Sequence, residues 1–231
     1  MPEDVGVLTS ETSQPRGPGP LAALVVLIAA VGGMLGVSLL LKHPSHPVLA
    51  VLLPQLTLVL VVIAAVFIGR WQPAACGMRR PQLRYLLIGF LMMPLVIGVA
   101  IGLQQLVFLM LGPVPDALKQ GDQKLLALYA MGGWSAMLLL TCVLPGIVEE
   151  LLMRGVVLSG LRRACPPWAA VLVTSLLFAA MHGSPWRFAP QFTLGLAVGW
   201  LAVRSGSCWP GALTHATYNA VAVVLLVVHP Q

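Results

Sequence analysis

Long apolar runs alternate with short polar segments from about residue 21 to the end of the chain. A helix needs roughly 20 apolar residues to cross the hydrocarbon core of a bilayer, and we interpret seven runs as membrane-spanning segments. The third should tilt or kink at Pro94. The fourth is too long for one crossing, so either Pro145-Gly146 breaks it or its first turns lie outside the bilayer. The predicted fold is all-α, a polytopic transmembrane helical bundle of about seven spans. The runs cover residues 21–41, 48–69, 85–111, 125–161, 168–181, 190–203 and 209–228.

The polar segments divide the chain into three parts. Residues 1–20 are rich in Pro, Gly, Ser and Thr, which predicts a disordered polar N-terminal tail. Residues 21–124 should form the N-terminal transmembrane helices, and residues 125–231 a second transmembrane core. We find no internal repeat of the kind that inverted-repeat transporters carry.

Composition and charge agree with a membrane protein. The chain is 58% hydrophobic and 9% charged, with a mean hydropathy of +0.93, whereas soluble domains have about 25% charged residues. The net charge of +6 does not indicate a nucleic-acid partner, because the basic residues lie between apolar runs. They are more numerous in the loops on the side of the N-terminus, so the positive-inside rule predicts a cytoplasmic N-terminus, and the plasma (inner) membrane if the source is bacterial. Four scattered cysteines without a CxxC pair indicate neither a disulfide framework nor a zinc ribbon.

Two of the seven acidic residues stand side by side within the fourth apolar run. An ionised carboxylate in a low dielectric costs several kcal/mol unless it is paired or hydrated. Glu150 and Arg154 are four residues apart, so on a helix they share a face and can pair. Glu149 points elsewhere and has no local partner. An acidic side chain inside a membrane segment is by default a candidate for function.

Three other polar side chains lie in or at the end of late apolar runs. His182 follows Phe178 by four residues, and His215 precedes Asn219 by four. Any one of them alone could simply be satisfied by a neighbouring helix, as often happens in bundles. Counted from the nearest loops, Glu149 and His182 lie about 20 and 21 Å deep. His215 and Asn219 lie about 10 and 16 Å deep. Three separate helices therefore bring polar groups to a similar depth, which predicts one shared site.

Two chemistries fit these residues, and both would hydrolyse an amide. In the first, Glu149 with His182 activates a water as general base, and His215 with Asn219 donates hydrogen bonds to the oxyanion. In the second, Glu149, His182 and His215 bind zinc and leave an open position for water. The amide of Asn219 favours the version without a cofactor, because an amide is a poor zinc ligand and a good oxyanion donor. Zinc stays open as the alternative.

The three motifs resemble those of the CPBP family of intramembrane proteases, also called ABI, which includes the Ras-converting CAAX endopeptidase. The family pattern is Glu-Glu-x-x-x-Arg, then Phe-x-x-x-His, then His-x-x-x-Asn. Here it reads Glu149 to Arg154, Phe178 to His182, and His215 to Asn219. The resemblance covers roughly residues 125–225 and makes residues 125–231 a CPBP-type catalytic core.

The resemblance also implies roles for these residues. Glu149 would be the general base with His182, while His215 and Asn219 would form the oxyanion hole. Glu150 and Arg154 would give structural support, as would Phe178. The family includes enzymes described as glutamate-dependent and others described as metalloproteases.

The predicted function is an intramembrane endopeptidase that acts on a membrane-associated protein or peptide. Its substrate could be lipidated, CAAX-like or C-terminally anchored, although no residue here is recognisable as a reader of a prenyl group. Two non-catalytic alternatives are a membrane scaffold or immunity protein, and a carrier that uses the buried acid as a proton relay. A carrier would more naturally show inverted repeats.

Overall fold

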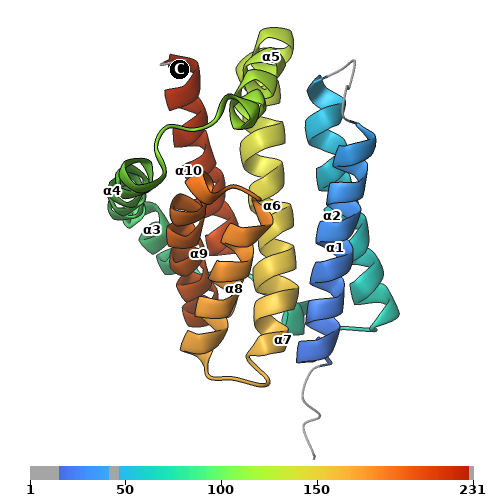
Figure 1. Cartoon of the computed structure of the whole chain (residues 1–231). Helices are drawn as coiled ribbons and strands as arrows, with labels where there is room; N and C mark the ends of the chain where they lie inside the picture. The colour runs from blue at the N-terminus through green and yellow to red at the C-terminus, as the bar shows by residue number, and fades with distance from the viewer. Residues whose placement is uncertain (1–15, 42–46, 229–231) are drawn as a thin grey trace, which may run out of the picture.

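The computed structural model describes residues 16–41 and 47–228, and that part of the chain is built from helices without strands (Figure 1). Most of the predicted tail, residues 1–15, and most of the polar turn after the first run lie outside the described residues. The predicted all-α fold is confirmed. In chain order the helices are α1 (Pro20–Leu40), α2 (Pro47–Ile68), the 3₁₀ helix η1 (Pro73–Cys76), α3 (Leu83–Leu91), α4 (Met93–Leu111), α5 (Asp116–Leu138), the π-helix η2 (Leu139–Val143), α6 (Leu144–Glu150), the π-helix η3 (Leu151–Leu158), α7 (Ser159–Leu161), α8 (Pro167–Met181), α9 (Pro185–Ser205) and α10 (Trp209–Val228).

Five helical stretches of the described chain are long and apolar enough to cross a membrane. The helix α8 is apolar but shorter, and α9 does not belong to the five. The membrane-bundle class is therefore confirmed, whereas the count of seven spans is not. The predicted boundary between residues 124 and 125 falls inside α5, so the division into an N-terminal and a C-terminal part remains a prediction. The five stretches are Pro20–Leu40, Pro47–Ile68, Leu83–Leu111, Gly121–Leu161 and Trp209–Val228.

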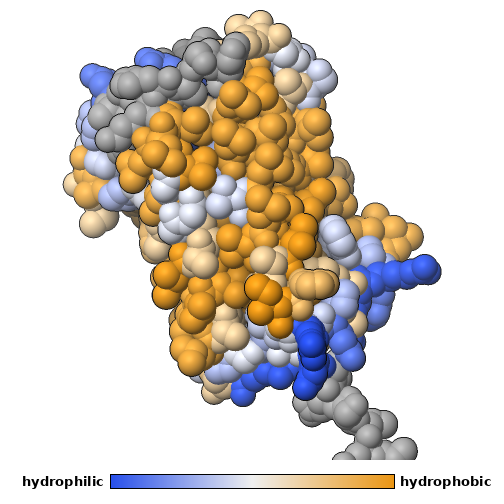
Figure 2. Space-filling model, turned by 90° about the vertical axis from the view of Figure 1, so that its right-hand side faces the viewer, coloured by the Kyte–Doolittle hydropathy of each residue, from blue (hydrophilic) through white to orange (hydrophobic). Residues whose placement is uncertain are grey.

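Apolar side chains cover most of the face that Figure 2 shows, and hydrophilic side chains gather toward its ends. Large apolar side chains on α1, α2 and α4 are open to the surroundings, among them Leu40 (87% exposed), Phe67 (83%) and Leu109 (82%). Each square ångström of apolar surface left in water costs about 25 cal/mol, so this surface suits a lipid environment. The chain is an integral membrane protein.

Prolines and glycines decide where the long helices bend. The third run breaks at Met92, which caps both α3 and α4 just before Pro94, so the predicted kink is present. In the fourth run the backbone leaves the helical conformation at Gly133, which has φ 61° and ψ −162°. The proposed break at Pro145-Gly146 is wrong, because η2, α6 and η3 continue through it. Pro145 begins a helical turn there, a position where its missing N–H costs little.

The continuous helix formed by α6 and η3 lies at the centre of the bundle (Figure 1). Its apolar residues, such as Val148 and Val156, pack in one core with α1, α2, α8 and α9. Glycines allow the closest approaches to this helix. A Cβ on Gly146 would lie 3.0 Å from the carbonyl oxygen of Ala212 and 3.0 Å from the Cβ of Ala216. The α6–α10 contact therefore depends on a missing side chain.

Replacing Gly146 by Val should lower the free energy of unfolding by about 1–3 kcal/mol, the usual cost of forcing extra methyl groups into a packed contact. The matched control is Gly102→Val, because a Cβ at Gly102 meets nothing within 4 Å and both changes gain the same helix propensity. Thermal unfolding of the purified protein in detergent measures the difference. Equal midpoints for the two variants would contradict the close packing of α6 on α10.

Candidate active site

A buried ion cluster joins three helices around one oxygen of Glu150. The Nη1 of Arg154 donates a hydrogen bond to Oε1 of Glu150 at 2.8 Å, and the Nδ1 of His215 lies 3.1 Å from the same oxygen. The Nη2 of Arg154 donates to the carbonyl oxygen of Gly195 at 2.9 Å. The side chains of Glu150 and Arg154 are fully buried. The predicted Glu150–Arg154 pair is present, and it extends to α9 and α10.

His215 lies against Glu150, a contact that the motif spacing alone does not reveal. Because a carboxylate only accepts hydrogen bonds, Nδ1 of His215 is the protonated nitrogen in this contact. A Cβ on Gly211, one turn earlier in α10, would lie 2.9 Å from Oε2 of Glu150. Gly211 therefore provides the space in which the carboxylate lies next to α10.

Glu149 points to the other side of α6 and contacts α2. The Nε2 of Gln55 donates to Oε1 of Glu149 at 3.2 Å. Oε2 of Glu149 has no hydrogen-bond partner among the described residues, and Glu149 is 8% exposed, against 0% for Glu150. The two adjacent carboxylates thus have different surroundings: Glu150 is held by two basic side chains and Glu149 by one neutral amide.

Gln55 is the site residue that sequence analysis missed. It belongs to the first half of the chain, where no family motif occurs. Its signal was weak but present: a single amide directly after Pro54, within an apolar run that lacks charged residues. A polar side chain in the middle of a membrane helix needs a partner, and Glu149 is that partner.

His182 follows the last residue of α8, and its ring is held by its own helix. The Nδ1 of His182 lies 2.8 Å from the carbonyl oxygen of Phe178. A carbonyl only accepts, so Nδ1 carries the proton, and Nε2 is left as the basic nitrogen in the neutral ring. The charge of Glu149 acts on this imidazole, as does that of Arg187 at the start of α9. Glu149 is hydrogen-bonded to Gln55, and His182 is hydrogen-bonded to the carbonyl of Phe178. The side chains of Glu149 and His182 therefore interact electrostatically, without a hydrogen bond between them.

One aromatic ring lies between the basic groups of the cluster. The ring centroid of Phe178 is 5.0 Å from that of His182 and 5.5 Å from that of His215, both edge to face. The guanidinium of Arg154 lies over the same ring, 4.9 Å from its centroid. Phe178 is fully buried and therefore fixes the spacing of the two imidazoles.

Asn219 is oriented by a carbonyl group that the local helix leaves without its usual donor. Its Nδ2 donates to the carbonyl oxygen of Thr141 at 3.2 Å. In a regular α-helix that oxygen would accept from residue 145, but Pro145 has no N–H. The π-helices η2 and η3 lie on either side of the Glu149-Glu150 pair, and such irregular turns often occur at functional sites.

Among the described residues, no three His, Cys, Asp or Glu side chains form a group that could hold a metal ion. The set predicted as zinc ligands, Glu149, His182 and His215, is divided here, because His215 is drawn to Glu150. Zinc remains the alternative that the residue types suggested.

The fold and the cluster define a class: a membrane protein whose buried carboxylates, imidazoles and amide have the composition of a hydrolytic site. Residues 131–221 match the family model described as Type II CAAX prenyl endopeptidase Rce1-like. All three motifs fall inside the matched segment, and the family resemblance noted in the sequence is confirmed. No curated protein and no solved structure gives a match.

Replacing Arg154 by Met should destabilise the protein strongly, because it leaves the buried Glu150 carboxylate without its guanidinium. Breaking a buried pair in this way typically costs about 3–5 kcal/mol. The control is Lys119→Met, which breaks the solvent-exposed pair with Asp116 and should not change the unfolding midpoint measurably. Thermal unfolding in detergent compares the two. Similar midpoints would show that Arg154 does not stabilise the cluster.

Proposed function

We propose that the chain is an intramembrane endopeptidase in which Glu149 activates the attacking water. The observation that supports this role is the unequal engagement of the two acids. Glu150 is fully buried between Arg154 and His215 and contacts α10. Each acid has one buried oxygen without a hydrogen-bond partner among the described residues, but Glu149 bonds only a neutral amide. A general base must be able to take up a proton, and of the two acids Glu149 is the one that no basic side chain holds.

The proposed reaction begins with proton transfer from water to Glu149. The resulting hydroxide attacks the carbonyl carbon of the scissile amide and forms a tetrahedral oxyanion. His182, whose Nε2 is the basic nitrogen, assists in carrying the proton from Glu149 to the departing amine nitrogen. Cleavage of the carbon–nitrogen bond then yields a carboxylic acid and an amine, which become carboxylate and ammonium by proton exchange, and the site returns to its starting protonation state.

His215 and Asn219 are the proposed donors to the oxyanion. Asn219 has two N–H groups and uses one on Thr141, which leaves the other for substrate. His215 directs Nδ1–H toward Glu150, so a second proton on Nε2 would create an imidazolium whose charge the Glu150 carboxylate balances. A cationic donor in a water-poor site stabilises a developing oxyanion strongly. Glu150 would then support catalysis through His215.

The proposed substrate is a membrane-associated protein or peptide, cleaved near a lipidated, CAAX-like or C-terminally anchored end. The description of the matched family names a prenyl endopeptidase, and the apolar surface around the site suits a substrate that arrives through lipid. We also propose that the activity needs no cofactor. One zinc bound per chain, lost together with activity on chelation, would replace this version with the zinc-dependent one.

Replacing Glu149 by Gln, or His182 by Ala, should reduce cleavage by about 10²–10⁴-fold, the usual contribution of general acid–base groups, while the protein still inserts into membranes. The assay compares C-terminal peptides of membrane proteins from cells with the native protein and cells with each variant. Asp116→Asn, which changes an exposed acid far from the cluster, is the control and should process normally. Unchanged processing by Glu149→Gln would exclude the protease mechanism and favour a scaffold or carrier.

Replacing Gln55 by Leu should lower cleavage by about tenfold or more without preventing folding, because a hydrogen bond to a charged group contributes about 1.5–3 kcal/mol. Replacing it by Glu should be worse, since a second carboxylate would face Glu149. The matched control is Gln104→Leu, which removes an amide from the crevice between α4 and α10. An equal rate for the native protein and Gln55→Leu would mean that α2 does not position the base.

A further inference from the structure

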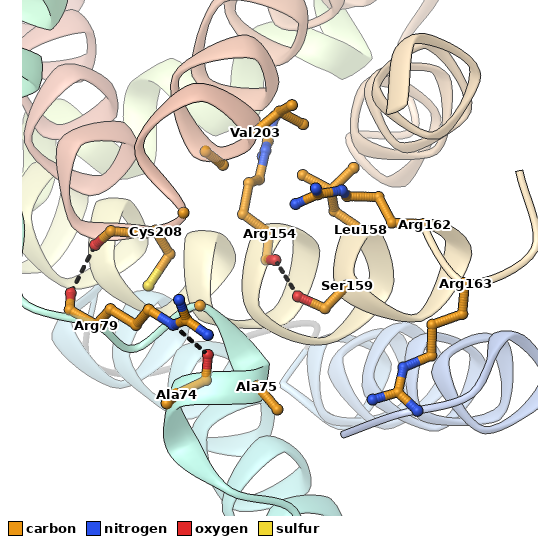
Figure 3. A pocket seen from close by; sticks show the side chains of 14 residues that line it. Ala74, Ala75, Arg79, Arg154, Leu158, Ser159, Arg162, Arg163, Val203 and Cys208 are labelled. Atoms are coloured by element: carbon orange, nitrogen blue, oxygen red, sulfur yellow. Dashed lines mark hydrogen bonds between the residues drawn. The ribbon is translucent and has the colours of Figure 1, made fainter. Parts of the chain in front are cut away.

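A second cavity, of about 430 Å³, lies at the end of the bundle where α1 begins and α7 ends (Figures 1 and 3). Three segments form its walls: η1 with the turn after it, the end of η3 with α7, and the turn between α9 and α10. Two hydrogen bonds hold these walls together. Oγ of Ser207 donates to the carbonyl oxygen of Arg79 at 2.8 Å, and the N–H of Cys208 donates to Gly77 at 2.9 Å. Contacts between segments far apart in the sequence therefore determine the shape of the cavity.

Arginines line this cavity, and among the residues that the structure describes no Asp or Glu lines it. In Figure 3 the side chains of Arg79 and Arg162 extend from opposite walls, and the side chain of Arg163 points away from both. Arg154 contributes mainly its backbone, because its guanidinium is engaged by Glu150. Nε of Arg79 donates to the carbonyl oxygen of Ala74 at 3.2 Å, which orients that side chain. Two guanidinium groups, those of Arg79 and Arg162, thus come to one cavity from opposite walls, and like charges brought together raise the local potential.

The positive-inside rule does not explain this convergence. The rule accounts for the number of arginines at this end of the bundle, and Arg80 and Arg204 satisfy it from positions outside the cavity. It places no constraint on where a guanidinium points. The hydroxyls of Ser159 and Ser207 lie in the same walls, but both donate to backbone carbonyls, so the guanidinium groups are the donors left for a ligand. Guanidinium groups around a small cavity are typical of a phosphate site.

We propose that this cavity binds the phosphate group of an anionic phospholipid. Its volume lies within the range of about 300–1,000 Å³ usual for small-molecule sites, and basic pockets between transmembrane helices commonly hold anionic headgroups. The segment that leads into α1 passes the same wall: a Cβ on Gly17 would lie 3.0 Å from a guanidinium nitrogen of Arg163. Leu21, at the start of α1, is 75% exposed, so a lipid chain has an apolar surface beside the headgroup.

The test compares the double variant Arg79→Gln/Arg162→Gln with the control Arg80→Gln/Arg204→Gln, which loses the same charge outside the cavity. The full chain is reconstituted in vesicles of phosphatidylcholine alone and of an equal mixture with phosphatidylglycerol, and thermal unfolding is measured. Phosphatidylglycerol should stabilise the native protein and the control, and its apparent affinity should fall by about tenfold or more in the double variant. Equal stabilisation of all three proteins would overturn the proposal.

Two further arms separate the sources of phosphate and guard against misfolding. Inorganic phosphate, added to phosphatidylcholine vesicles, should give no comparable stabilisation. If it stabilises the native protein as strongly as the lipid does, the lipid assignment is wrong. Arg162→Lys retains the charge but loses bidentate geometry, so it should fold and show an intermediate loss of affinity. Native affinity in Arg162→Lys together with native affinity in the double variant would exclude the cavity as the site.

Discussion

The structure depends on a charge held where water cannot reach it. Oε1 of Glu150 receives Arg154 from its own helix and His215 from α10, and Arg154 passes the contact on to α9 through Gly195. An isolated carboxylate at this depth would be prohibitive, and removal of Arg154 would leave the carboxylate without a counter-charge. Inside lipid, apolar packing alone discriminates poorly between neighbouring helices. The ion cluster therefore specifies which helices meet and in which register.

This constraint also separates the tasks of two neighbouring residues. A helix turns by about 100° per residue, so adjacent carboxylates cannot share a partner, and each faces a different set of helices. Glu150 faces the permanently charged Arg154, while Glu149 faces Gln55 on α2 and the edge of the cluster near His182. An acid that does chemistry must change its protonation state, and one that holds a fold must not. In the proposed mechanism the Glu-Glu sequence would supply both from a single turn.

The sequence was informative where a local rule determines the contact. Four-residue spacing predicted the Glu150–Arg154 pair, the apolar runs predicted the membrane bundle, and Pro94 predicted a kink. The position of His215 against Glu150 could not be predicted, because it depends on how closely α10 approaches at Gly146 and Gly211. Gln55 lies 94 residues from its partner, so its lone amide could be noticed in the sequence but the residue that it contacts could not. The bend at Gly133 was not predicted, because proline is usually the stronger helix breaker. Pro145 removes only one backbone hydrogen-bond donor, and the helix continues through it.

The ring of Phe178 has a consequence for how the cluster responds to a substrate. Both imidazoles and the guanidinium contact one rigid, fully buried body. A displacement of either histidine must be transmitted through that ring to the other, so the distance between the two imidazoles behaves as a fixed length. A peptide substrate of the proposed protease would therefore meet two imidazoles at a set separation. Its selectivity would then depend first on the backbone geometry that the peptide presents there, and only afterwards on its side chains.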